Sequence, residues 1–95
     1  MRLIFVRHAP SEGYFIRDDE EADFLREITI EGKKEFTRTT LKALRKNFKL
    51  IDVIFTSPLV RAIQTAEMIS AEVLTAHFAI HRCCAAKASE CRHCN

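Results

Sequence analysis

Two arginines and a histidine follow apolar segments of the chain, at positions where they could bind and attack a phosphate group. Arg7 and His8 directly follow the apolar residues 3–6, and Arg61 lies six positions after the largely apolar residues 51–55. A guanidinium group is a fixed cation whose forked donors match two oxygens of one anion. An imidazole can act as a nucleophile, a base or an acid near neutral pH. Together these residue types predict phosphoryl chemistry.

His8 is the expected nucleophile of that chemistry. A neutral imidazole with one free ring nitrogen can attack phosphorus and carry the phosphoryl group as a covalent intermediate. We expect the other ring nitrogen to donate a hydrogen bond to a backbone carbonyl or a carboxylate. Arg7 and Arg61 would then stabilise the charge on the phosphoryl oxygens in the transition state. Each residue alone is typical of a surface charge, so the hypothesis depends on their combination.

The hydrophobic pattern predicts elements that bring these residues to one edge of a sheet. Residues 2–6 and 50–55 are predicted to form strands buried on both faces. Between them, Thr29 is the expected N-cap of a helix. The residues that follow its 3.6-residue period are Phe36, Thr40, Ala43, Leu44 and Phe48. Because ligands of parallel sheets bind beyond the carboxyl ends of the strands, His8 and both arginines should meet there.

Ser57 and Pro58 predict the start of a second helix, since serine caps free amides and proline tolerates the first helical position. This helix is expected to run to about Leu74. Its predicted inward stripe consists of Leu59, Ala62, Ile63, Ala66, Ile69 and Val73. The order strand, helix, strand, helix implies a right-handed crossover. We therefore expect an α/β fold with three layers, α/β/α, around a mainly parallel sheet.

The connection after the first predicted strand, residues 9–28, is long. It contains Pro10, Gly13 and an acidic run over residues 18–21. A charge run is most often a solvated loop face. Long loops at the carboxyl end of a strand are also often functional, so a role in gating the site is the alternative.

Length and composition limit the class of protein. A chain of 95 residues forms one small domain, and 29% charged with 47% hydrophobic residues is typical of a globular protein. The net charge of +2 is too small to indicate nucleic acid or a membrane surface as a partner. No apolar segment approaches the roughly 18 residues of a membrane span. We therefore expect a cytoplasmic protein, and the sequence leaves its oligomeric state open.

Two segments resemble the histidine phosphatase (phosphoglycerate mutase-like) superfamily. Residues 7–9 resemble its Arg-His-Gly signature, with alanine in place of the glycine, and residues 57–66 look like its second motif, Ser-x-x-x-Arg-Ala-x-x-Thr-Ala. The resemblance implies the phosphoglycerate mutase-like form of the α/β fold. It also implies a phosphatase with His8 as nucleophile, Arg7 and Arg61 as phosphate ligands, and no cofactor.

A third segment is similar to the small SixA-type phosphohistidine phosphatases of that superfamily. Arg26, Thr29 and Gly32 match the pattern Arg-x-Leu-Thr-x-x-Gly, with Ile28 in the place of the leucine. The resemblance implies that the substrate is a phosphorylated protein histidine or a small phosphoester. It also implies Arg26 and Ser57 as supporting residues of the phosphate site.

The resemblance covers residues 1–74, which we expect to form the N-terminal half of the family's domain. The family also uses a second histidine after a later strand and an acidic proton donor, and nothing after Leu74 resembles either motif. We expect a truncated or frame-shifted chain in which residues 75–95 form an irregular tail that contains cysteine and histidine. The alternative to an active enzyme is a catalytically inactive phosphate-binding or interaction domain.

All four cysteines lie within the last thirteen residues. They are Cys83, Cys84, Cys91 and Cys94. Their absence from the first 82 residues fits a reducing compartment. With the nearby histidines they provide enough soft ligands for one zinc ion, but zinc modules normally have more chain between their ligand pairs. We therefore expect no metal site, with a zinc-stabilised binding module as the alternative.

Overall fold

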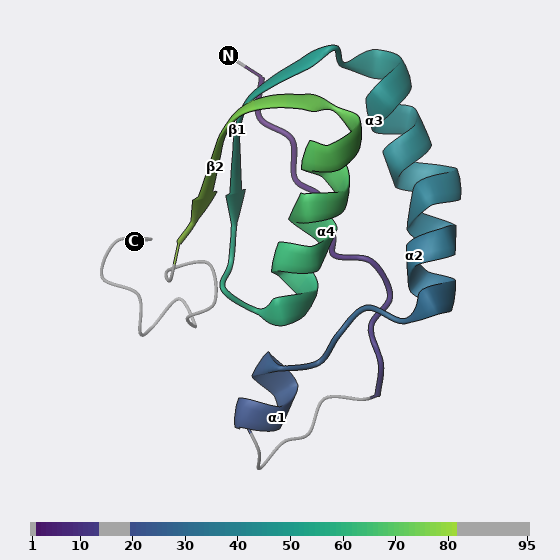
Figure 1. Ribbon diagram of the computed structural model, residues 1–95, viewed down its shortest axis with the longest axis vertical. Helices are drawn as coiled ribbons and strands as arrows, with labels where there is room; N and C mark the ends of the chain where they lie inside the picture. Colours follow the sequence, from purple (N-terminus) through teal and green to yellow (C-terminus); the bar gives the residue numbers. More distant parts are fainter. Residues whose placement is uncertain (1, 14–19, 82–95) are drawn as a thin grey trace.

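The structure, a computed structural model, describes residues 2–13 and 20–81. In chain order its elements are α1 (Glu20–Phe24), α2 (Ile30–Phe36), the π-helical turn η1 (Thr37–Leu41), α3 (Lys42–Asn47), β1 (Leu50–Thr56), α4 (Val60–Glu72) and β2 (Leu74–Ile80). The strands form a small parallel sheet, and α2, α3 and α4 all lie on one side of it (Figure 1). The α/β class with a parallel sheet is confirmed, and the described residues contain two of its layers.

β1 and β2 pair in parallel, from Leu50 opposite Leu74 to Thr56 opposite Ile80. Parallel neighbours need a crossover connection, and α4 supplies it. β1 confirms the second predicted strand but not its predicted burial on both faces, because Leu50, Val53 and Phe55 are exposed. β2 has no counterpart among the predicted strands, and its ladder with β1 stabilises it. The division of the chain at Leu74 stays a prediction, and residues 82–95, with all four cysteines, lie outside the described residues.

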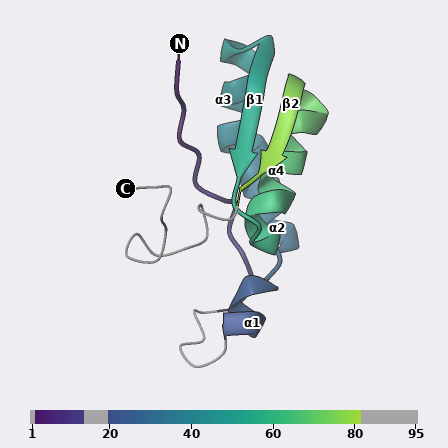
Figure 2. The same ribbon diagram turned by 90° about the vertical axis from the view of Figure 1, so that its left-hand side faces the viewer.

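The first predicted strand, residues 2–6, is absent from the structure. This segment runs beside β1, on the side away from β2, without joining the sheet (Figure 2). Phe5 is 88% exposed and Leu3 72% exposed. A parallel strand is stabilised when both of its faces are covered, but the described helices lie on one side only. Apolar composition alone therefore gave the wrong prediction here.

A nearly continuous helix over α2, η1 and α3 begins where the sequence predicts. Thr29 is the N-cap of α2, and its Oγ1 accepts a hydrogen bond from the Gly32 amide at 2.8 Å. Thr29 has an extended backbone, as an N-cap residue should. The cap therefore fixes the position of α2 relative to the preceding segment.

The π-helical turn η1 changes which residues of this helix face the core. Phe36 and Leu41 are both buried although they are five positions apart, and Leu44 is buried one turn later. In a regular α-helix a spacing of five would place two side chains on different faces. The wider π turn restores their alignment. The sequence period therefore missed Leu41 and wrongly predicted Ala43, which is exposed, as an inward residue.

Helix α4 begins later than predicted. Its N-cap is Leu59, without a side-chain cap hydrogen bond, and the helix starts at Val60. The predicted cap at Ser57 is therefore wrong: the Ser57 Oγ accepts only a long contact from the Leu59 amide, at 3.4 Å. Pro58 and Leu59 instead form a bend before the helix, and Leu59 has a non-helical backbone.

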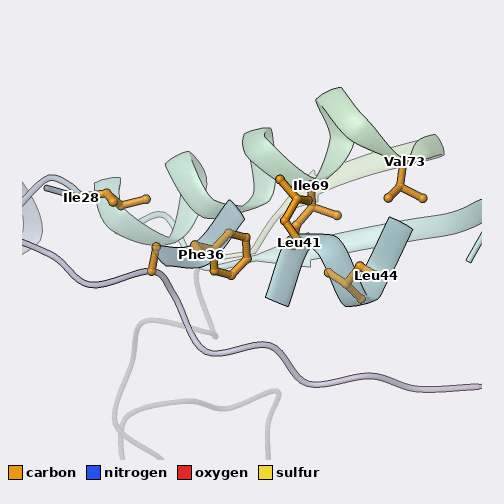
Figure 3. Packing of buried hydrophobic residues seen from close by; sticks show 7 residues of the cluster. Ile28, Phe36, Leu41, Leu44, Ile69 and Val73 are labelled. Carbon is orange, nitrogen blue, oxygen red and sulfur yellow. The ribbon is translucent and has the colours of Figure 1, made fainter. Parts of the chain in front are cut away.

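The core lies between α4 and the helix formed by α2, η1 and α3, where Leu41 and Ile69 meet (Figure 3). Its buried residues are Ala9, Ile28, Phe36, Leu41, Leu44, Ile69 and Val73. The last two confirm part of the predicted stripe of α4. Ala9 and Ile28 extend the core to the segments on either side of α1. Among the described helices, none has the length and apolar character needed to cross a membrane.

Candidate active site

A pocket of about 570 Å³ lies where the His8 segment meets the middle of the long helix. Its lining residues come from the first segment, from Arg26 and from α2 and η1. They are Arg7, His8, Ala9, Pro10, Ser11, Arg26, Glu35, Phe36, Thr39 and Thr40. The structure thus brings together three of the residues predicted for the site, and it does not place Arg61 or Ser57 in the lining.

His8 has the contact expected of a histidine nucleophile. Its Nδ1 lies 2.7 Å from the carbonyl oxygen of Ala9. When Nδ1 carries the ring proton it donates to this carbonyl, and Nε2 keeps a lone pair. The ring is partly buried and lies on the wall of the pocket. A nucleophilic nitrogen and a fixed ring orientation therefore occur together in this tautomer.

Hydrogen bonds to two other parts of the chain hold the residues that follow His8. The Ala9 amide donates to Thr65 Oγ1 of α4 at 3.0 Å, and the Pro10 carbonyl accepts from the Thr29 amide at 3.1 Å. Gly32 allows the second contact, because a Cβ at this position would stand 2.1 Å from the Pro10 oxygen. The glycine matched by resemblance therefore has a steric role beside the pocket.

Arg26 lines the pocket and also contacts residues on both sides of the start of α1. Its guanidinium donates to the Gly13 carbonyl at 3.2 Å, and its Nε lies 2.9 Å from Asp23 Oδ1 in an ion pair. The acidic run was expected to be a solvated face or a gate. Asp18 and Asp19 lie outside the described residues, and Glu20 begins α1.

Arg61 is buried and paired with the same aspartate. Its guanidinium donates to the Asp23 carbonyl oxygen at 2.7 Å and lies 3.5 Å from Asp23 Oδ2. The Asp23 carboxylate therefore lies between Arg26 and Arg61, with one oxygen toward each. This arrangement matches the way two guanidinium groups would hold a phosphate. The ion pair accounts for the absence of Arg61 from the pocket lining.

Sequence reasoning missed three residues that organise the site: Asp23, Gln64 and Thr65. Asp23 precedes Arg26 by three positions, which is the spacing of a helical ion pair and was a usable signal. Gln64 accepts from the Ile28 amide at 2.8 Å, and Thr65 accepts from the His8 segment. Both contacts join positions far apart in the chain. Thr65 is the threonine of the second motif, but no local pattern indicates either contact.

Ser57 is buried beside the end of β1, where its oxygen faces the start of α4 rather than the pocket. Within residues 2–13 and 20–81, no three His, Cys, Asp or Glu side chains converge as metal ligands. The cysteines of the zinc alternative lie outside these ranges, so that alternative stays untested.

A comparison with known families identifies the superfamily of the chain. The family model of the histidine phosphatase superfamily (branch 1) matches residues 3–81, which include both sequence motifs and all described elements from α1 to β2. No curated protein matches the sequence. Membership of this superfamily supports a phosphatase-type function, hydrolase or mutase, with a phosphorylated small molecule or protein as substrate. The chain therefore belongs to the histidine phosphatase superfamily.

Proposed function

We propose that this chain hydrolyses a phosphorylated protein histidine or a small phosphoester through a phosphohistidine intermediate on His8. The observation that carries the proposal is the contact of His8 Nδ1 with the Ala9 carbonyl, in a pocket that also contains Arg7 and Arg26. It provides a nucleophile with a fixed ring beside two fixed cations. Phosphoryl transfer needs little else from a protein than such positioning and charge.

In the proposed first step, Nε2 of His8 attacks phosphorus while the bond from phosphorus to the leaving oxygen or nitrogen breaks. The leaving group takes its proton from water, and the phosphoryl group stays on Nε2. In the second step a water molecule attacks phosphorus, the phosphorus–nitrogen bond breaks, and inorganic phosphate leaves. His8 returns to its neutral form. Throughout, the Nδ1 proton stays directed at the Ala9 carbonyl.

Arg7 and Arg26 are the proposed phosphate ligands that already line the pocket. Arg61 is proposed as a third ligand, and for this role its guanidinium must exchange the Asp23 carboxylate for a phosphate oxygen. The SixA-type substrate is favoured by the segment from Arg26 to Gly32, whose first residue lies in the pocket. A cytoplasmic setting accords with the 82 residues that precede the first cysteine.

A non-catalytic phosphate-binding or interaction domain is the second candidate. The observation that favours it is the ion pair of Arg61 with Asp23, which leaves two rather than three arginines in the pocket. Such a domain would bind phosphate without turnover. The two candidates therefore differ in product formation and not in phosphate binding.

The test is hydrolysis of an aryl phosphate and of a phosphohistidine peptide by the full chain, compared with His8→Ala. We expect release of inorganic phosphate by the unmodified chain and its complete loss in the variant. The matched control is His77→Ala, an exposed histidine on β2, which should keep the full rate. Hydrolysis that survives in His8→Ala would overturn the proposal. Phosphate-dependent stabilisation without product in any variant would establish the second candidate.

A further inference from the structure

We propose that Thr65 is a positioning residue that fixes the backbone beside His8 relative to α4, the helix that carries Arg61. The inference rests on the proposed role of His8 as nucleophile. Thr65 Oγ1 accepts a hydrogen bond from the Ala9 amide at 3.0 Å and donates one to the Arg61 carbonyl at 2.8 Å. One hydroxyl thus connects the backbone next to His8 with the backbone of Arg61.

The need for such an anchor follows from the first segment. Residues 2–7 belong to no strand and are exposed, and among the described residues their backbone forms no hydrogen bond. Apart from Arg2, which lies over the Phe48 ring, this segment offers little that could fix the position of His8. The Ala9 amide is the first backbone group of this segment with a partner in the folded core. Ala9 is 1% exposed and Thr65 is 4% exposed, so water does not compete for this bond.

Thr65 is linked to the imidazole through a single residue. The Ala9 amide is held by Thr65, and the Ala9 carbonyl is the group that His8 Nδ1 contacts at 2.7 Å. If the amide shifts, the carbonyl on the other side of the same Cα shifts with it. The ring then loses the partner that selects its tautomer. Thr65 thus acts on the chemistry through Ala9 and does not itself line the pocket.

The chemistry of the hydroxyl explains why this residue type is required. A hydroxyl both donates and accepts, so a single side chain can satisfy the Ala9 amide and the Arg61 carbonyl. Serine keeps both functions. Valine has nearly the same shape and has neither function, so Thr65→Val leaves the buried Ala9 amide without a partner. The pair of substitutions separates hydrogen bonding from packing.

The experiment uses the full chain with Thr65→Val, Thr65→Ser and Ile69→Val. Ile69 is buried on α4 one turn after Thr65, and Ile69→Val removes one methyl group from the core and lowers stability without removing a hydrogen bond to the His8 segment. For each protein we would measure the urea midpoint, the ¹⁵N shifts of the His8 ring, and the rate of aryl phosphate hydrolysis. The ring shifts distinguish the Nδ1-protonated tautomer from the Nε2-protonated one whether or not hydrolysis occurs.

We expect Thr65→Val and Ile69→Val both to lower the urea midpoint. Only Thr65→Val should lose the Nδ1-protonated signature of His8, with a fall in kcat of about 100-fold at little change in KM, as displacement of a reacting group produces. Thr65→Ser should restore both. A Thr65→Val protein that loses stability but keeps the ring signature of the unmodified chain would overturn the inference, because the hydroxyl would then serve stability alone.

A measurement on the unmodified chain covers the case in which Thr65→Val does not fold. In subdenaturing urea, the exchange protection of the Ala9 amide and the Nδ1-protonated signature of His8 should disappear together. Loss of the ring signature while the amide stays protected would contradict the coupling. The ring-shift and exchange measurements need no hydrolysis, so they test the inference separately from the proposed function. The proposed function would be overturned by a different observation, namely hydrolysis that survives in His8→Ala.

Discussion

At the scale of single residues, the carboxylate of Asp23 controls what Arg61 can bind. It lies between the guanidinium groups of Arg26 and Arg61, and all three side chains are at most 16% exposed. Two cations face one anion, so the cluster keeps a net positive charge. A phosphate dianion offers the two arginines more charge and more acceptor oxygens than one carboxylate does.

We predict that Asp23→Asn lowers the free energy of unfolding by about 1–3 kcal/mol, because it leaves two largely buried guanidinium groups without an anion. Inorganic phosphate should then raise the Tm of this variant by more than it raises that of the unmodified chain, since it replaces the missing charge. Thermal unfolding with and without phosphate, at constant ionic strength, measures both effects.

Asp52→Asn is the matched control, because Asp52 is exposed on β1 and outside the pocket. It should change stability by less than about 0.5 kcal/mol and leave the response to phosphate unaltered. Equal stabilisation of Asp23→Asn and the unmodified chain by phosphate would show that Arg26 and Arg61 do not form a shared anion site.

At the scale of elements, the π turn η1 connects the core to the pocket. It aligns Phe36 with Leu41 in the core, and the same turn places Thr39 and Thr40 on the pocket wall. A π turn is an α-helix with one extra residue, and such turns often occur at functional sites. The five residues of η1 therefore contribute both to the pocket wall and to the apolar face of the core.

Deletion of Thr37, an exposed residue of η1, tests this role. It leaves Phe36 and Leu41 four positions apart, which is the spacing of one α-helical face. We predict stability within about 1 kcal/mol of the unmodified chain. Phosphate affinity should fall, because Thr39 and Thr40 move relative to Glu35 and Phe36, which line the pocket before the deletion site. Urea unfolding and phosphate titration measure the two effects.

The control for this prediction is deletion of Ala43, which is exposed in the regular helix α3. It rotates Leu44 away from the face it shares with Leu41, so we expect a loss of more than about 2 kcal/mol. Similar losses for the two deletions would mean that η1 is as constrained as the helix around it. Unchanged phosphate binding after deletion of Thr37 would remove the proposed link to the pocket.

At the scale of the whole molecule, the described chain has a small core and an apolar first segment that stays exposed. Phe36 is 4% exposed and Phe5 is 88% exposed. We predict that Phe36→Ala lowers the free energy of unfolding by about 3–5 kcal/mol and that Phe5→Ala changes it by less than about 0.5 kcal/mol. Urea unfolding gives both values. A loss of several kcal/mol in Phe5→Ala would show that residues 2–6 form the buried strand that their composition predicts.

Most of the regular structure could be predicted because its signals are local. The Thr29 cap, the strand β1 and two of the four buried residues of α4, Ala66 and Ile69, follow from patterns within a few positions. Two failures occurred where distant partners decide: the first segment lacks a covered face, and β2 depends on its ladder with β1. The third failure is local, since a bend over Pro58 and Leu59 delays the start of α4.

The candidate site also combines residues that the sequence identifies with contacts that only the fold provides. The motifs supplied His8, Arg7 and Arg26, and the structure brings these three to one pocket. Arg61 was also identified, but its ion pair with Asp23 joins positions 38 apart in the chain. A charge on a helix can be recognised from sequence. The acidic partner of that charge cannot be recognised from sequence, because the chain contains many acidic residues and only the fold brings one of them into contact.

The sequence by itself predicted the chemistry that we propose, since His8 and the arginines lie in short motifs and His8 contacts the next carbonyl along the chain. Only the tertiary structure decided how these groups are held: Thr65 reaches Ala9 across 56 positions, and η1 shapes the wall opposite His8. The physical reason is the range of the interactions. Local hydrogen bonds and side-chain periodicity are encoded by adjacent residues, whereas burial and ion pairing exist only after distant segments have packed.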